Sequence, residues 1–101
     1  MKRRLLKLNN NRGKSLIVQE YIRNPLLYNG RKFDIRVFML IGVNNGQVRG
    51  YWYQDGYVRT ASYLWDLEDM EDNEVHLTND AIQKYSVNYG RYEQGNKLGY
   101  N

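Results

Sequence analysis

The sequence contains no cysteine, a single histidine and a single proline among its 101 residues. The absence of cysteine excludes disulfides and thiolate metal sites and is typical of proteins in a reducing compartment. With His76 as the only histidine, a histidine-based metal site is disfavoured as well. No apolar run approaches the ~20 residues of a membrane span, and no apolar segment of signal-peptide length follows the basic N-terminus. We therefore expect no membrane partner.

The composition is that of one globular domain or a piece of one, with 42% hydrophobic and 26% charged residues. Its charge is unevenly distributed along the chain. Ten lysines and arginines but two acids occur through Arg36, whereas five basic and nine acidic residues follow. A basic half beside an acidic half predicts an anionic partner, for which phosphate, nucleic acid and acidic peptide all qualify.

The stretch 31–41 reads as a β-strand with two different faces, because residues two apart share a face of a strand. One face begins with three charged residues and the other is apolar. The charged residues are Lys32, Asp34 and Arg36, and the apolar residues expected to face a core are Phe33, Ile35, Val37, Met39 and Ile41. The charged end is either a solvated strand end with an ordinary ion pair or a site that binds an ionic group.

Turn residues divide the middle of the chain into further strands. Asn44-Asn45-Gly46 predicts a tight hairpin, because asparagine and glycine tolerate positive φ. Strands are expected over 15–22, 48–53 and 57–60, with an Asn29-Gly30 turn before the 31–41 strand and Leu26-Leu27 packing onto the sheet. We predict an α+β fold whose middle is an antiparallel β-meander with short helices.

The flanking segments have less pattern. Residues 1–14 are basic and rich in asparagine and are predicted to form an arm. The acidic stretch 66–74 is expected to be a solvated loop or helical turn rather than a cation site, because no apolar wall surrounds the acids. A short helix is predicted over 80–85, capped by Thr78 or Asn79. His76 lies among apolar neighbours, as satisfied buried histidines do.

Two binding hypotheses follow from the residues alone. Arg36 and Arg59 are planar cations on separate predicted strands, suited to carboxylate or phosphoryl oxygens, with Lys32 and Asp34 beside them. The alternative is a nucleic-acid surface built on the aromatic stretch 51–53. Strand alternation would place Tyr51 and Tyr53 on one face and Trp52 on the other, so at least one of them is expected to be core.

Several ordered motifs together resemble the tubulin tyrosine ligase-like family over residues 15–100. They are Val18-Gln19-Glu20-Tyr21-Ile22, Pro25-Leu26-Leu27, Gly30-Arg31-Lys32-Phe33-Asp34-Ile35-Arg36, Arg59-Thr60-Ala61, His76-Leu77-Thr78-Asn79, Ile82-Gln83-Lys84, Tyr89-Gly90-Arg91-Tyr92-Glu93 and Gly95-Asn96. The resemblance implies an ATP-grasp fold and an enzyme that phosphorylates a carboxylate with ATP and then joins it to an amine. Negative charge that builds up during such a reaction calls for positioned cations.

The resemblance also implies roles for individual residues. Adenine would lie against Gln19, Glu20, Tyr21 and Ile22, and the phosphate and ribose would lie against Lys32 and Asp34. The catalytic residues Arg36 and Arg59 would contact the acyl phosphate and the incoming amino acid. Thr78 and Asn79 would close over the nucleotide, and Lys97 would lie near the amino-acid substrate. Many members have lysine where this chain has Glu20. Glutamate-adding members commonly have Tyr-Ser where this chain has Asp80-Ala81, which favours tyrosine or glycine addition.

The implied partners are ATP, a free amino acid and the acidic C-terminal tail of tubulin, at microtubules in the cytoplasm, with cilia among the candidate locations. Magnesium is expected from the family, but its ligands and the lysines before the adenine segment are not in these 101 residues. The chain is thus expected to be the central part of an ATP-grasp domain (15–101), inactive alone. The rival hypotheses are a non-enzymatic remnant that binds tubulin and a basic nucleic-acid-binding β-module; of these, nucleic acid is the less favoured partner.

Overall fold

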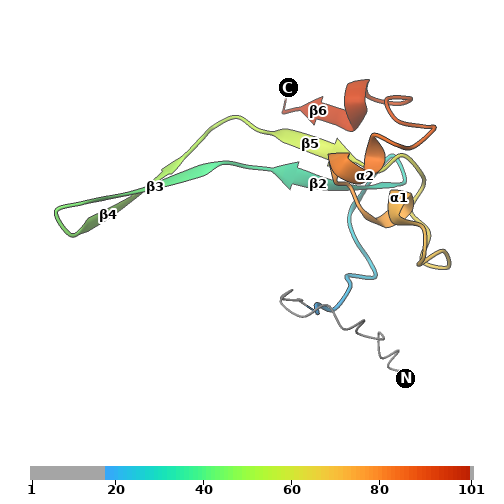
Figure 1. Cartoon of the computed structure of the whole chain (residues 1–101), viewed down its shortest axis with the longest axis horizontal. Coiled ribbons are helices and arrows are strands. Elements are labelled where there is room, and N and C mark those ends of the chain that lie inside the picture. The colour runs from blue at the N-terminus through green and yellow to red at the C-terminus, as the bar shows by residue number, and fades with distance from the viewer. Residues whose placement is uncertain (1–17, 101) are drawn as a thin grey trace, which may run out of the picture.

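The computed structural model describes residues 18–100, which form short antiparallel strands and short helices (Figure 1). In chain order the elements are β1 (Leu27–Tyr28), β2 (Arg31–Arg36), β3 (Met39–Asn44), β4 (Gln47–Trp52), β5 (Tyr57–Thr60), α1 (Asn73–His76), α2 (Asp80–Gln83), the 3-10 helix η1 (Gln94–Asn96) and β6 (Lys97–Gly99). The predicted α+β class is confirmed. The arm predicted for residues 1–14 lies outside the described residues.

The strands pair in nested order, not as the predicted meander. β3 pairs with β4, and β2 pairs directly with β5, in a sheet of order β1-β2-β5-β6. Four residues (53–56) stand opposite two (37–38) between the two ladders, so the strand predicted over 31–41 is interrupted there. A meander would have required β4 to pair with β5. Instead β2 and β3 pair with β5 and β4, respectively, so that these four strands form one long hairpin with an interruption in the middle.

Both predicted Asn-Gly turns are confirmed. Asn29 and Gly30 have φ values of 48° and 73°, and Asn45 and Gly46 have values of 48° and 77°. Positive φ at both central residues is the geometry whose twist matches that of paired strands. These turns fix which residues of β2 and β3 lie opposite their partners, and therefore which face each side chain occupies.

Two other predicted elements differ from the structure. Of the strand predicted over 15–22, residues 15–17 lie outside the described part and residues 18–22 form no strand. No described strand pairs with 18–22, and a strand needs a hydrogen-bonded neighbour. The predicted helix 80–85 is present as the shorter α2. Asn79 occupies its N-cap position but makes no side-chain capping hydrogen bond.

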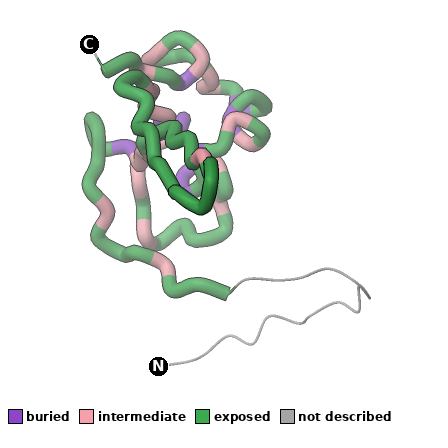
Figure 2. Tube along the Cα trace, turned by 90° about the vertical axis from the view of Figure 1, so that its left-hand side faces the viewer, coloured by how far each residue is buried: buried purple, intermediate pink, exposed green. Residues whose placement is uncertain are grey.

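Few residues are buried (Figure 2), and most of those that are buried are polar. Ala61 and Val75 are the buried hydrophobic residues of the described part. The expectation that the apolar face of 31–41 lies against a core is wrong. Phe33 is half-buried, and the other four residues, Ile35, Val37, Met39 and Ile41, are exposed. Leu26, expected to pack onto the sheet, is exposed too.

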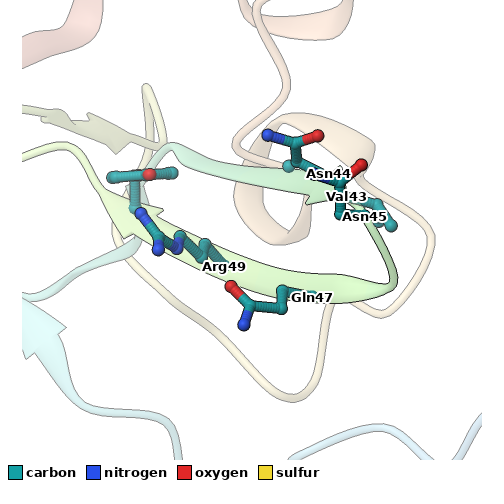
Figure 3. A pocket seen from close by; sticks show the side chains of 7 residues that line it. Val43, Asn44, Asn45, Gln47 and Arg49 are labelled. Atoms are coloured by element: carbon teal, nitrogen blue, oxygen red, sulfur yellow. The ribbon is translucent and has the colours of Figure 1, made fainter.

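The β3–β4 hairpin extends away from the helices (Figure 1) and is exposed along its length. One of its faces carries Met39, Ile41, Val43, Val48 and Trp52, because residues paired across an antiparallel ladder share a face. The other face has a hollow of about 360 Å³ lined by residues that include Asn44, Gln47, Arg49 and Tyr51 (Figure 3). No residue of the predicted site lines this hollow.

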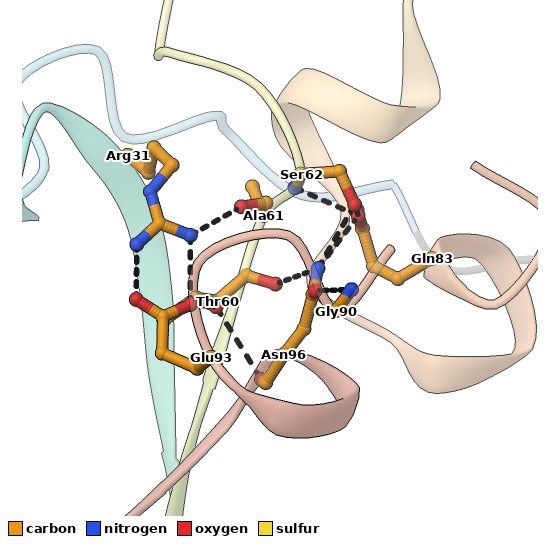
Figure 4. A network of polar contacts seen from close by, with 8 residues as sticks. All are labelled: Arg31, Thr60, Ala61, Ser62, Gln83, Gly90, Glu93 and Asn96. Carbon is orange, nitrogen blue, oxygen red and sulfur yellow. Dashed lines mark hydrogen bonds and ion pairs between the residues drawn. The ribbon is translucent and has the colours of Figure 1, made fainter. Parts of the chain in front are cut away.

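A buried polar network holds the compact end of the molecule together (Figure 4). The Asn96 amide donates to the Thr60 carbonyl at 3.1 Å and to Ser62 Oγ at 2.9 Å, and its oxygen accepts from the Gly90 amide at 2.7 Å. Gln83 Oε1 accepts from the Ser62 amide at 2.8 Å. The end of β5, the helix α2 and the loop before β6 are thereby joined by polar contacts.

A buried ion pair completes this network. Arg31, only 2% exposed, forms a two-pronged contact with Glu93, with Arg31 Nη1 donating to Glu93 Oε2 at 2.9 Å. Thr60 Oγ1 also donates to Glu93 Oε2, at 2.8 Å. The hydrogen bonds from Arg31 and Thr60 outweigh burial and hold the pKa of Glu93 below its usual value. The folded state therefore favours the carboxylate form of Glu93.

We expect Glu93→Gln to lower the free energy of unfolding by about 3 kcal/mol, since removing one partner leaves a buried, unpaired charge. Because the folded state depresses the pKa of Glu93, the wild-type chain should also lose stability as the pH falls below about 4. Urea denaturation measured from pH 7 to pH 3 should show a weaker pH dependence for the variant. Glu68→Gln, at an exposed position, is the control. Equal stability of the two variants would contradict the role of the pair.

Candidate functional site

Five of the predicted site residues share one face of the β2–β5–β6 sheet. Asp34 lies opposite Arg59, and Arg59 lies opposite Lys97, so these three side chains form a row across three strands. Lys32 and Arg36 lie on the same face of β2, two residues to either side of Asp34. The alternation predicted for the charged face of this strand is therefore confirmed, and Arg59 and Lys97 extend that face.

The centre of the row is an ion pair between Asp34 and Arg59. Arg59 Nε donates to both carboxylate oxygens, at 3.0 and 3.1 Å, and an Nη2 contact completes a fork-like geometry. Burial raises the pKa of Asp34, but hydrogen bonds from Arg59 and Thr78 outweigh it and the net pKa is lowered. The same pair raises the pKa of Arg59. Asp34 thus orients Arg59.

The chain from His76, the last residue of α1, to Asp80, the first residue of α2, crosses this face and contacts it with every second residue. The His76 carbonyl accepts from Lys32 Nζ at 2.9 Å, Thr78 Oγ1 donates to Asp34 Oδ1, and Asp80 Oδ1 lies 3.4 Å from Lys97 Nζ. Thr78 is buried in this contact. The Thr78 hydroxyl, predicted as a possible helix cap, instead binds a carboxylate of the site.

Tyr21 and His76 support Lys32, which lies beside the row on β2. His76 Nε2 donates to the Asp69 carbonyl oxygen at 2.7 Å, because a carbonyl oxygen can only accept, and Nδ1 lies 2.7 Å from the Tyr21 hydroxyl. Lys32 Nζ lies 3.4 Å from the Tyr21 hydroxyl and 4.7 Å from the centre of its ring. The prediction of a satisfied, buried histidine is confirmed.

The segment predicted to meet adenine lines an open cavity of about 460 Å³. Lys32 and Phe33 form part of its wall. The predicted residues that line it are Gln19, Glu20, Tyr21, Ile22 and Lys32. This volume is within the range of small-molecule sites. Four consecutive residues of the chain and a lysine from β2 are thus gathered around one hollow, although residues 18–22 do not form the expected strand.

The remaining predicted residues lie at the margins of the site. The Arg36 guanidinium is exposed and lies 5.5 Å from the centre of the Phe38 ring. Asn79 is exposed between Thr78 and Asp80. Sequence reasoning gave no role to Arg31, Glu93, Gln83 or Asn96, although each belongs to a motif of the family resemblance. These four residues could have been noticed because each is a large polar residue within a family motif, yet none was expected to contact a ligand.

Two alternative kinds of site, a metal site and a nucleic-acid surface, have little support in the described residues. Within residues 18–100 there is no group of three or more histidines and acids that could hold a metal ion. Tyr51, Trp52 and Tyr53 are all exposed, so the expectation that at least one is core is wrong. Tyr51 and Trp52 occupy opposite faces of the isolated hairpin, where Arg49 is the cation. Bases stack on aromatic residues beside several cations, and this surface offers few.

Comparison of the sequence with known protein families identifies the family of this chain. The sequence matches the model of the tubulin-tyrosine ligase family over residues 2–100. The chain belongs to this family. The match also takes in most of the segment 1–14, beyond the residues 15–100 that carry the motif resemblance.

Several curated relatives are about equally similar to this member of the tubulin-tyrosine ligase family. "Probable tubulin polyglutamylase TTLL9" of Mus musculus is 41% identical over 73 residues, 72% of this chain and 16% of that protein. "Tubulin glycylase 3B" of Drosophila melanogaster is 41% identical over 75 residues, 74% of this chain and 10% of that protein. "Probable alpha-tubulin polyglutamylase Ttll1" of Tetrahymena thermophila is 40% identical over 81 residues, 78% of this chain and 19% of that protein. The chain spans less than a fifth of the length of these relatives.

The contact between Thr78 and Asp34 yields a test of the site geometry. We expect Thr78→Val to raise the pKa of Asp34, because one hydrogen bond that stabilises its carboxylate is lost while Arg59 remains. The free energy of unfolding should fall by about 1 kcal/mol. Nuclear magnetic resonance titration of the Asp34 carboxyl carbon measures the first effect. Thr78→Ser keeps the hydroxyl and is the matched control, and identical Asp34 titrations in the two variants would show that Thr78 does not contact Asp34.

Proposed function

We propose that this chain forms the nucleotide- and acyl-phosphate-binding wall of an ATP-dependent ligase that attaches an amino acid to tubulin. The observation that carries the proposal is the row Asp34–Arg59–Lys97 on one sheet face, with Lys32 and Arg36 beside it. Family membership supports the reaction class. The relatives named as a tubulin polyglutamylase and a tubulin glycylase support tubulin as the partner.

The proposed reaction has two steps. An oxygen of a carboxylate attacks the γ-phosphorus of ATP, which gives an acyl phosphate and ADP. The amine of the second substrate then attacks the acyl carbon, phosphate leaves with the bonding electrons, and the nitrogen loses a proton as the amide forms. Both steps move negative charge over phosphoryl oxygens, so fixed cations aimed at those oxygens lower the barrier.

Each residue of the row has a role that its geometry supports. Arg59 is fixed by Asp34 and presents a planar guanidinium to the acyl phosphate or to the carboxylate of the amino acid. Arg36 is exposed and free to approach the same group. Lys97, opposite Arg59, would face the amino-acid substrate. Thr78 and Asn79 would close over the nucleotide.

The nucleotide would lie between the 460 Å³ cavity and the row. Adenine would contact the backbone of Gln19–Ile22, and Lys32 would reach a phosphate from the wall of the same cavity. Glu20 stands where many members have lysine, so the side-chain contact of that lysine would be lost while the backbone contacts with adenine remain. The described residues offer no cluster that fits magnesium, and none of the proposed roles involves that ion.

This site would belong to an ATP-grasp domain, of which residues 15–101 supply the central part. The protein would act in the cytoplasm at microtubules, with cilia among the sites of action. Within the described part, no helix has the length and apolar character needed to cross a membrane. Tyrosine or glycine is the proposed amino acid in preference to glutamate, because Asp80-Ala81 replaces the Tyr-Ser of glutamate-adding members.

Arg59 carries the first test of the proposed function. In the full-length protein, Arg59→Ala should reduce the incorporation of labelled amino acid into tubulin at least about 100-fold, the loss typical for removing a group that stabilises transition-state charge. ATP binding should be largely kept, because Arg59 is not assigned to the nucleotide. Arg59→Lys keeps the positive charge but not the planar guanidinium, so its rate of incorporation should lie between those of the wild type and Arg59→Ala. Arg49→Ala, on β4, is the control. Normal ligation by Arg59→Ala would overturn the assignment.

Lys32 carries the complementary test. Lys32→Gln should raise the dissociation constant of ATP about tenfold, equivalent to one charge-assisted contact. Isothermal titration calorimetry with ATP measures it. Lys84→Gln makes the same change at an exposed position after α2 and should leave ATP binding unaltered. Equal ATP affinity in the two variants would exclude Lys32 from the nucleotide site.

A non-enzymatic tubulin-binding protein is the second candidate, favoured by the ten lysines and arginines against two acids through Arg36. It would bind the acidic tubulin tail through its basic half. Tubulin binding that weakens with salt, without incorporation of tyrosine, glycine or glutamate in the presence of ATP, would establish this candidate instead.

A further inference from the structure

Asp80 stands at the far end of the charged row, beside Lys97. It is the first residue of α2, and its Oδ1 lies 3.4 Å from Lys97 Nζ. Both side chains remain accessible, at 46% exposure for Asp80 and 43% for Lys97. Lys97 in turn lies directly opposite Arg59 on the neighbouring strand. Any group that approaches Arg59 along this face therefore meets the Asp80 carboxylate and the Lys97 amine together.

A second contact fixes the Asp80 carboxylate in place. The Tyr89 hydroxyl donates to Asp80 Oδ1 at 2.8 Å. This hydrogen bond, with a smaller contribution from Lys97, lowers the pKa of Asp80. Tyr89 belongs to the loop that the buried Asn96 ties to β5 through Gly90. The carboxylate is thus held in its charged form and is positioned by the same network that fixes the sheet.

The charges of the row are consequently matched in pairs. Asp34 pairs with Arg59, and Asp80 pairs with Lys97. An amino acid bound here must place its own carboxylate on a cation, and the exposed Arg36, which makes no ion pair with a described residue, can receive it. A second carboxylate on the side chain of the amino acid would need another cation. The nearest one, Lys97, is already neutralised by Asp80.

We propose that Asp80 is a specificity-determining residue that makes this site select an amino acid with an uncharged side chain. The inference rests on the proposed ligase function and assigns its substrate preference to one carboxylate. A glutamate side chain would meet the negative charge of Asp80 and lose the attraction of Lys97, whereas glycine or tyrosine would lose nothing. Unpaired like charge is a common means of rejecting a competing ligand.

The test is a competition between labelled glycine and labelled glutamate for ligation to tubulin by the full-length protein. Asp80→Asn removes the charge but keeps an oxygen that accepts from Tyr89. It should raise the ratio of glutamate to glycine incorporated about fivefold, the range expected for an exposed charge pair. Asp80→Glu retains the charge and should keep the wild-type ratio. Asp66→Asn makes the same chemical change at an exposed loop position and should also leave the ratio unaltered.

Lys97→Gln provides an independent arm if Asp80→Asn fails to fold. Without the lysine the Asp80 charge is unopposed, so the ratio should fall instead of rise. A ratio unchanged by either substitution, with total ligation retained, would overturn the role of Asp80 and leave the ligase function standing. Absence of ligation with every amino acid, in wild type and variants alike, would overturn both proposals.

Discussion

The buried contact between Arg31 and Glu93 is the constraint on which the rest of the described structure depends. Arg31 is the first residue of β2, and Glu93 precedes the turn into β6. Their pairing, with Thr60 of β5 as a third member, ties β2 and β5 to a loop residue that lies 62 positions after Arg31. Where most domains of this size would bury aliphatic side chains, this one buries charge and amide groups, each of which needs a specific partner.

This polar core also determines the arrangement of the site face. Because side chains alternate along a strand, burying Arg31 on one face of β2 leaves Lys32, Asp34 and Arg36 on the other. The loop that carries Glu93 leads directly into Lys97, so the contact that anchors this loop also brings Lys97 opposite Arg59. Structural and functional residues therefore alternate within the same short strands.

Local features were predictable from the sequence because short-range chemistry determines them. The two Asn-Gly turns and the alternation of β2 are of this kind, whereas the satisfied state of His76 depends on Tyr21, 55 positions away. The pairing of β2 with β5 was not predictable, since several pairings satisfy the same strand pattern. The exposure of Ile35 and Val37 depends on what packs over them, which their own pattern cannot specify.

The site itself was predictable only in part. Charged alternation and the family motifs located Lys32, Asp34, Arg36, Arg59 and Lys97, and the structure brings these five onto one face. The pairing of Asp34 with Arg59 and the crossing of the segment 76–80 are tertiary contacts between residues up to 44 positions apart. No local spacing rule could assign them. Charge also misleads at Arg31: this residue is charged and next to Lys32 in sequence, yet it is buried and does not belong to the site face.

The exposed β3–β4 hairpin has a consequence for how this chain behaves at high concentration. Both of its strands are edge strands, because no other described strand pairs with either of them. Each outer edge therefore presents backbone amides and carbonyls that accept a further strand, next to apolar side chains that would be covered in the process. Protein concentration, rather than temperature alone, would then determine how long a solution of this chain stays free of intermolecular β-sheet.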